Sequence, residues 1–207
     1  MPLGFLVVFS EPGNQVTLEE FQGPPLAPPI PPCFSTYQPD WYNNEHVPLR
    51  MNHLKSFLTG ARFSAADSLK PSWLALYDID DTSVFQHESY TRLRANRSPR
   101  EADLVVRLEV LDRRTCEALS DSGVSPITSS LASSNPTTSI VTHGVDVTMH
   151  GSIDEWTKDT FDKLRNVKGW VRTRSFKCID NLRTGTSITG KDPEEQTVSK
   201  YIILHGE

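Results

Sequence analysis

The residues best suited to acid/base chemistry lie in a short segment that begins at Trp41. His46 is the leading candidate, because an imidazole with a pKa near ~6.5 can give or take a proton at neutral pH without a cofactor. Tyr42 lies one helical turn earlier on the same face, where it can orient a substrate carbonyl or hydroxyl. Two other interpretations stay open: His46 can instead bond to backbone freed by Pro48, and Tyr42 can be a core residue.

Four further residues are candidates for substrate binding. Trp41 suits an aromatic cavity for a planar substrate, although a tryptophan more often fills a core. His53 extends the polar stripe of His46, and we expect it to be exposed. Arg62 and Asp78 lie on adjacent predicted strands, where burial would require partners. Either they pair with each other, or Arg62 binds an acidic substrate.

The sequence lacks the minimal motifs of several common classes of enzyme. The sequence has no HExxH, GxGxxG, Walker or GxSxG pattern, so we expect neither a metal nor a cofactor. His143 and His150 are poorly spaced for a shared metal ion. Nearby acidic residues indicate a solvated surface for one basic cluster, Arg92, Arg94, Arg97 and Arg100.

Charge and composition narrow the range of partners. The chain of 207 residues has a net charge of −5 and three widely spaced cysteines without a CxxC pattern. An acidic chain lacks the electrostatic footprint of a protein that binds nucleic acid or an anionic membrane surface. The first apolar run, residues 3–9, does not fit a signal peptide or a membrane span. We therefore expect a cytoplasmic protein, in a reducing environment, with neither nucleic acid nor membrane as partner.

The first 120 residues predict the element order β-α-β-β-α. Residues 3–9 are expected to form a buried strand, and Thr17 with Glu20 makes the capping box of a short helix. A second helix is expected to begin near Asp40. Two strands, residues 56–64 and 72–79, should follow it and pair antiparallel.

A last helix of the first part is predicted from its start signal. Ser98 is the expected N-cap, Pro99 the first helical residue and Glu101 the third. We expect this helix to run to about Ala118. Its buried stripe would consist of Leu104, Leu108, Leu111 and Leu119.

The sequence divides at a Ser/Thr-rich linker, residues 121–139. Residues 1–120 precede it, and residues 140–207 follow it with the predicted order β-α-β-β. Residues 56–63 and 169–176 share a pattern, so the two parts are interpreted as degenerate repeats. The second repeat lacks its own β-α completion. We expect either a partner, such as a second copy in a homodimer, to cover the open sheet edge, or a truncated chain end.

The spacing of Trp41, His46 and Pro48 resembles the W-x-x-x-x-H-x-P signature of the EthD-like branch of the dimeric α/β-barrel superfamily, in the tandem-repeat form common in fungi. The likeness covers residues 3–119, and residues 140–205 more weakly. It implies an α+β fold in which ferredoxin-like repeats form a pseudo-dimeric barrel within one chain, the second repeat being incomplete. It also implies that the His46–Pro48 turn lies at the mouth of a cavity between helices and sheet.

The same resemblance implies a function for that cavity. It predicts a cofactor-independent enzyme that oxidises, decarboxylates or isomerises a small aromatic or polyketide-like molecule, with His46 as acid/base and Tyr42 as a positioning group. The second repeat does not keep the histidine, so a site is expected in the first repeat only. The alternative is a non-catalytic small-molecule-binding or stress-associated barrel protein.

A proline-rich tract interrupts the segment that precedes Trp41. Seven of the fifteen prolines lie between Pro24 and Pro39, where they exclude a helix. The flanking sequences would join into one amphipathic helix without residues 23–39, which we therefore interpret as an insertion, for example an intron read in frame. The other interpretation is a surface loop that binds an SH3-type module.

The insertion hypothesis predicts the peptide content of the native protein. If residues 23–39 are absent from it, a tryptic peptide joins Gln22 directly to Asp40. Peptide mass spectrometry of protein from its natural source makes the measurement. A peptide that contains Cys33 would contradict the hypothesis.

Overall fold

One antiparallel sheet of seven strands organises the chain in this computed structural model, which describes residues 4–22, 41–123, 131, 136–147, 152–188 and 197–206. The predicted insertion and most of the predicted linker lie outside the described residues. The strand order is β2-β3-β1-β4-β6-β7-β5, and each neighbouring pair is antiparallel. The strands are β1 (Gly4–Glu11), β2 (Phe57–Ser64), β3 (Trp73–Ile79), β4 (Val110–Asp121), β5 (Ile140–Val145), β6 (Arg172–Thr184) and β7 (Tyr201–Gly206).

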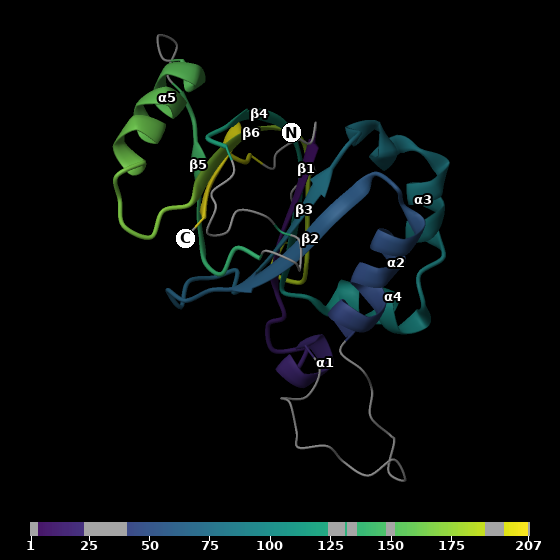
Figure 1. Cartoon of the computed structure of the whole chain (residues 1–207). Helices are drawn as coiled ribbons and strands as arrows, with labels where there is room; N and C mark the ends of the chain where they lie inside the picture. The colour runs from purple at the N-terminus through teal and green to yellow at the C-terminus, as the bar shows by residue number, and fades with distance from the viewer. Residues whose placement is uncertain are drawn as a thin grey trace.

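The sheet is curled into a half-barrel, and helices pack outside it (Figure 1). Figure 1 shows α2, α3 and α4 together beside β1, β2 and β3, whereas α5 lies beside β5 at the other end of the sheet. The helices are α1 (Leu18–Gln22), α2 (Val47–His53), α3 (Glu88–Ala95), α4 (Pro99–Arg107) and α5 (Ile153–Leu164). A π-helical turn, Tyr42–His46, leads into α2, and a 3₁₀ turn, Thr82–Gln86, leads into α3. The α+β class is thus confirmed.

Strand β1 is buried on both faces, because the helical layer covers one face and the curl of the sheet covers the other. Leu6 packs into a cluster under the helices, while Phe5 and Val7 face the inside of the curl. There the ring of Phe5 stacks on Phe176 of β6, with ring centroids 4.2 Å apart. A strand covered on both sides needs a continuous apolar run, which explains the unbroken apolar sequence of β1.

Two predicted helix starts, at Thr17 and Ser98, are confirmed by their capping hydrogen bonds. The backbone N–H of Glu20 donates to Thr17 Oγ1 over 3.1 Å, and that of Glu101 donates to Ser98 Oγ over 3.0 Å. At α5, Ser152 caps in the same way. Each side chain satisfies a backbone donor that the first turn of a helix leaves without a partner.

The predicted helix end near Ala118 is wrong. Helix α4 ends at Arg107, and residues from Val110 onward form β4, which bonds to β1 on one side and β6 on the other. Leu104 and Leu108 belong to the helical core as expected, but Leu119 is 36% exposed. Backbone hydrogen bonds to β1 and β6 outweigh the local helical pattern of residues 110–121. Residues near this segment in the sequence give no sign of that pairing.

The two parts of the chain share one sheet because β4 pairs with β6. The predicted pairing of residues 56–64 with 72–79 is confirmed as β2 with β3, and the expected strands and helix after residue 140 are present as β5, α5, β6 and β7. Cys116 and Cys178, distant in sequence, are register neighbours and free thiols. In the part of the chain that is described, no helix combines the length and apolar character needed to cross a bilayer.

The packing of α4 on the sheet predicts contrasting effects for two substitutions in that helix. Leu104 is fully buried and Val106 is 70% exposed. Leu104→Ala should lower the free energy of unfolding by about 2–5 kcal/mol, because it removes buried apolar contacts and leaves a cavity. Val106→Ala should change it by about 0.5 kcal/mol or less. Urea unfolding of both variants makes the comparison, and equal losses would contradict the docking of α4.

Candidate functional site

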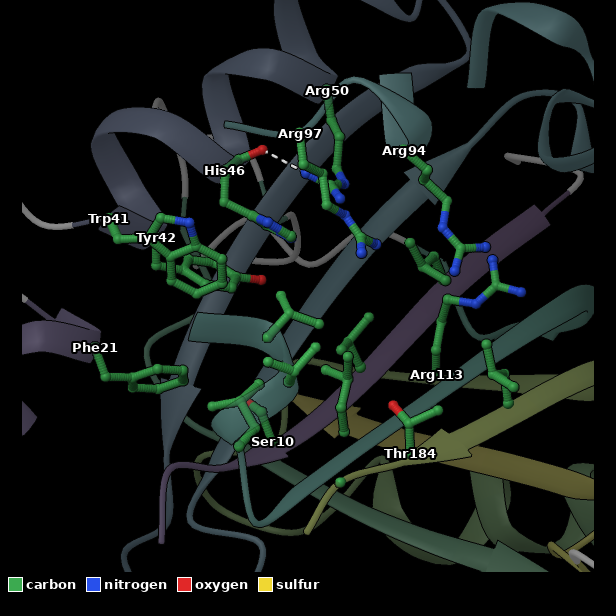
Figure 2. A pocket seen from close by; sticks show the side chains of 18 of the residues that line it. Ser10, Phe21, Trp41, Tyr42, His46, Arg50, Arg94, Arg97, Arg113 and Thr184 are labelled. Carbon is green, nitrogen blue, oxygen red and sulfur yellow. Dashed lines mark hydrogen bonds between the residues drawn. The ribbon is translucent and has the colours of Figure 1, made fainter. Parts of the chain in front are cut away.

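A cavity of about 410 Å³ lies between the helical layer and the sheet (Figure 2). Its apolar lining comes from the helix-facing side of β1 and β4 and from α4, including Leu6, Val8, Leu108 and Leu111. Its aromatic lining consists of Phe21, Trp41, Tyr42, Tyr77 and Tyr90. A cavity of this size and character is typical of small-molecule sites.

The π-helical turn places His46 and two aromatic residues against each other. The backbone N–H of Val47 donates to the carbonyl of Tyr42, which is the wider spacing of a π-helix. Pro48 follows at once and cannot donate a backbone hydrogen bond, so a change of helix type is favoured here. The imidazole of His46 lies 5.0 Å from the Tyr42 ring and 4.8 Å from the Trp41 ring, measured between centroids.

His46 pairs with a buried carboxylate from another helix. Its Nδ1 lies 2.8 Å from Oε1 of Glu101, which is the third residue of α4 and is fully buried. Two arginines lie near the same oxygen: Arg50 Nη2 and Arg97 Nε are each 3.7 Å from it. Arg50 also donates to the backbone carbonyl of His46 over 2.8 Å, as Figure 2 shows.

The charges of this cluster follow from burial and contact. Burial and the charge of Arg50 lower the pKa of His46 to about 4, although Glu101 acts in the opposite direction. Burial acts to raise the pKa of Glu101, but the hydrogen bond of His46 and the two arginines outweigh it, so this pKa is lowered. At neutral pH the pair is therefore a neutral imidazole beside a carboxylate.

This charge state assigns the two imidazole nitrogens. A carboxylate can only accept a hydrogen bond, so Nδ1 of His46 must carry the proton that it shares with Glu101. Nε2 is then the unprotonated nitrogen and a hydrogen-bond acceptor. His46 thus combines a fixed orientation with a basic atom, which is the arrangement of a general base held by a carboxylate.

Tyr42 is a neutral hydrogen-bonding group in the same wall. Its hydroxyl lies 2.9 Å from the hydroxyl of Tyr77, and both side chains are buried. Burial raises the pKa of Tyr42 and raises that of Tyr77 well above its ordinary value. Neither phenol is ionised at neutral pH, so Tyr42 can position a ligand but is not a phenolate base.

The structure brings together three of the six predicted site residues. Within the described part of the chain, the lining includes Trp41, Tyr42 and His46. The indole Nε1 of Trp41 is buried and has no hydrogen-bond partner there. His53 is exposed at the end of α2, as expected.

Arg62 and Asp78 lie outside the described lining and interact with different groups. The guanidinium of Arg62 lies 4.1 Å from the Tyr42 ring centroid, behind the cavity wall. Asp78 accepts hydrogen bonds from Arg174 over 2.6 Å and from Thr59 over 2.7 Å. Asp78 and Tyr77 are consecutive in β3 and so point to opposite faces of the sheet, which separates Asp78 from the cavity.

Sequence reasoning missed the charged groups of this site. The sequence pattern places Glu101 only in the first turn of a helix, and it gives no signal for Arg50. The interpretation of the basic cluster as a solvated surface is wrong for Arg94 and Arg97, which line the cavity. Arg113 also lines it and comes from β4, where a helix had been expected.

Comparison with known proteins gives no relative from which a function could be inferred. No match to the chain is found among protein families, curated proteins or solved structures. Among the described residues, no group of three or more His, Cys, Asp or Glu side chains is placed to hold a metal ion. The fold and site define an α+β protein with a curled antiparallel sheet and a cavity lined by a histidine that pairs with a buried glutamate behind the cavity wall.

The surroundings of His46 predict its titration. The imidazole should stay neutral as the pH falls from 7 to about 5 and gain a proton only near pH 4, because burial and Arg50 disfavour its charged form. Nitrogen-15 NMR of the imidazole nitrogens measures both the pKa and the Nδ1–H tautomer, with His46→Gln to assign the signals. Glu101→Gln should lower the pKa further, since it removes a negative charge. A pKa near 6.5 would contradict the buried pair.

Proposed function

We propose that the cavity is the active site of a cofactor-independent enzyme in which His46 acts as a general base toward a small aromatic or polyketide-like molecule. The observation that carries this proposal is the 2.8 Å contact between His46 Nδ1 and the buried carboxylate of Glu101. The contact holds the ring in one orientation and leaves Nε2 as the basic atom. The neighbouring aromatic rings suit a planar substrate.

The proposed step is a proton transfer. Nε2 of His46 takes a proton from an acidic C–H or O–H bond of the substrate, and the electron pair of that bond stays on the substrate. The imidazolium that forms is stabilised by Glu101, in the way that the carboxylate of a catalytic triad stabilises its histidine. The proton then returns to the substrate at the same or a neighbouring atom, or leaves to water.

Two donors near His46 can stabilise the negative charge on the substrate. Trp41 offers a buried indole N–H that lacks a protein acceptor in the described residues. Tyr42 contributes a neutral phenol whose hydroxyl is hydrogen-bonded to that of Tyr77. Donors fixed in a cavity before reaction can stabilise developing charge without having to reorient.

We also propose that the chain belongs to the EthD-like branch of the dimeric α/β-barrel superfamily. Support comes from the first part of the chain, where the element order is β1-α1-α2-β2-β3-α3-α4-β4. Helices thus follow β1 and β3, and with the sheet order β2-β3-β1-β4 this suits a ferredoxin-like repeat. The later strands repeat this arrangement as β6-β7-β5. The described residues after 140 include no counterpart of α4 and β4.

A non-catalytic small-molecule-binding protein is the second candidate. It is favoured by the low pKa of His46, about 4, because an imidazole with this pKa is a weak base. Under this alternative the Glu101 contact only satisfies a buried polar group. The two candidates differ in whether His46 moves a proton of the bound molecule.

Deuterium exchange tests the proposed proton transfer. The full chain is incubated in D₂O with a panel of small aromatic ketones and β-keto esters, and NMR follows deuterium incorporation at their acidic carbons. At least one compound should exchange faster than in buffer alone. His46→Gln should slow that exchange by roughly 10²–10⁴-fold, because it removes the base.

Two further variants sharpen this test. Glu101→Gln should also slow exchange, because it leaves the imidazolium without its carboxylate. His53→Gln should have no effect, since this exposed histidine of the same segment lies outside the described lining. Undiminished exchange in a folded His46→Gln variant would show that the catalytic assignment is wrong. Binding of the panel without any exchange would favour the second candidate.

A further inference from the structure

Four arginines line the cavity, and no aspartate or glutamate lines it among the described residues. They are Arg50 of α2, Arg94 of α3, Arg97 between α3 and α4, and Arg113 of β4. Figure 2 shows the guanidinium groups of Arg94 and Arg113 facing each other, with those of Arg50 and Arg97 on the His46 side. Four separate segments therefore place positive charge around one space.

Nearby acidic groups balance only part of this charge. Glu101 lies behind the wall, where one carboxylate is shared between Arg50 and Arg97. Asp180 pairs with Arg113 over 2.9 Å, but Asp180 is itself 58% exposed. Solvent therefore screens this ion pair, and the attraction between the two charges is weak. Arg94 has no ion pair in the described part of the chain, and its guanidinium carbon lies 6.0 Å from the centroid of the Tyr90 ring. Four cations thus face two carboxylates.

Two of these four arginines also have a guanidinium donor without an acceptor. The Nε atoms of Arg97 and Arg113 are buried without a hydrogen-bond partner among the described residues. Arg113 is held in place by a hydrogen bond from its Nη1 to the Tyr90 hydroxyl, over 3.2 Å. A buried donor without an acceptor is costly, so the hydrogen-bonding capacity of these two guanidinium groups is not fully used by the described residues.

We propose that the cavity binds a small organic acid whose carboxylate lies between Arg94, Arg97 and Arg113. A planar carboxylate matches the forked donors of guanidinium groups that face each other. The apolar body of the ligand would lie on Leu6, Val8 and Leu108, and its other end would approach His46. This inference rests on the proposed function, since it names the substrate class of the same cavity.

Binding of a carboxylate would also strengthen the base. A carboxylate bound to Arg97 would offset the positive charge of that arginine, which is one cause of the lowered pKa of His46. An acidic ligand would thus raise the pKa of His46 when it binds. An uncharged ligand of the same shape would not.

A pair of isosteric compounds tests the inference with the full chain. Isothermal titration calorimetry at low salt compares 2-naphthoate with uncharged 2-naphthamide, neither of which needs to react. Naphthoate should bind at least about tenfold more tightly, as expected for charge-assisted hydrogen bonds. Arg94→Gln should reduce naphthoate binding by about tenfold and leave naphthamide binding unchanged. Arg92→Gln is the matched control, because it removes an equal charge from an exposed position two residues away on α3.

Three outcomes would overturn the inference. They are equal affinity for the two compounds, equal effects of Arg94→Gln and Arg92→Gln, and no binding of either compound at millimolar concentration. The result is separable from the proposed function because it needs no turnover. A cavity that selects naphthoate but exchanges no proton contradicts the proposed function alone, whereas one that exchanges protons but ignores ligand charge contradicts this inference alone.

Discussion

The buried carboxylate of Glu101 is the contact on which the site depends. A carboxylate that is removed from solvent requires partners, and here they come from α2 and from the turn between α3 and α4. Helix α2 must therefore approach the start of α4, which brings the π-helical turn and its aromatic residues over the sheet. The cavity lies between these helices and the apolar faces of β1 and β4.

The curl of the sheet separates two environments that share the same strands. Inside the curl, the Phe5–Phe176 stack and the buried Asp78–Arg174 pair fill the space with contacts between β1, β3 and β6. Outside it, Leu6 and Tyr77 face the helices and the cavity. Successive side chains of a strand point to opposite faces of the sheet. Neighbouring residues of one strand therefore pack inside the curl and line the cavity in turn.

Burial lowers the pKa of the basic groups in this cavity. It lowers the pKa of His46 to about 4 and lowers that of Arg97, because both charged forms lose solvation. His46 responds by being neutral, while the arginines keep their charge at neutral pH. The cavity therefore places a neutral base next to positive charge that nearby carboxylates balance only in part, which favours an anionic ligand.

Local signals in the sequence determined much of the fold and part of the site. The helix caps at Thr17, Ser98 and Ser152 and the strands β1, β2 and β3 depend on nearby residues, and His46, Tyr42 and Trp41 are neighbours along one turn. Only the tertiary structure decided that residues 110–121 form a strand, because that depends on bonding to β1 and β6. It also decided the partner of His46, since Glu101 is 55 residues away and no sequence period links them. Burial and electrostatic contact act through space, so the charge state of the site could not be predicted from the order of residues along the chain.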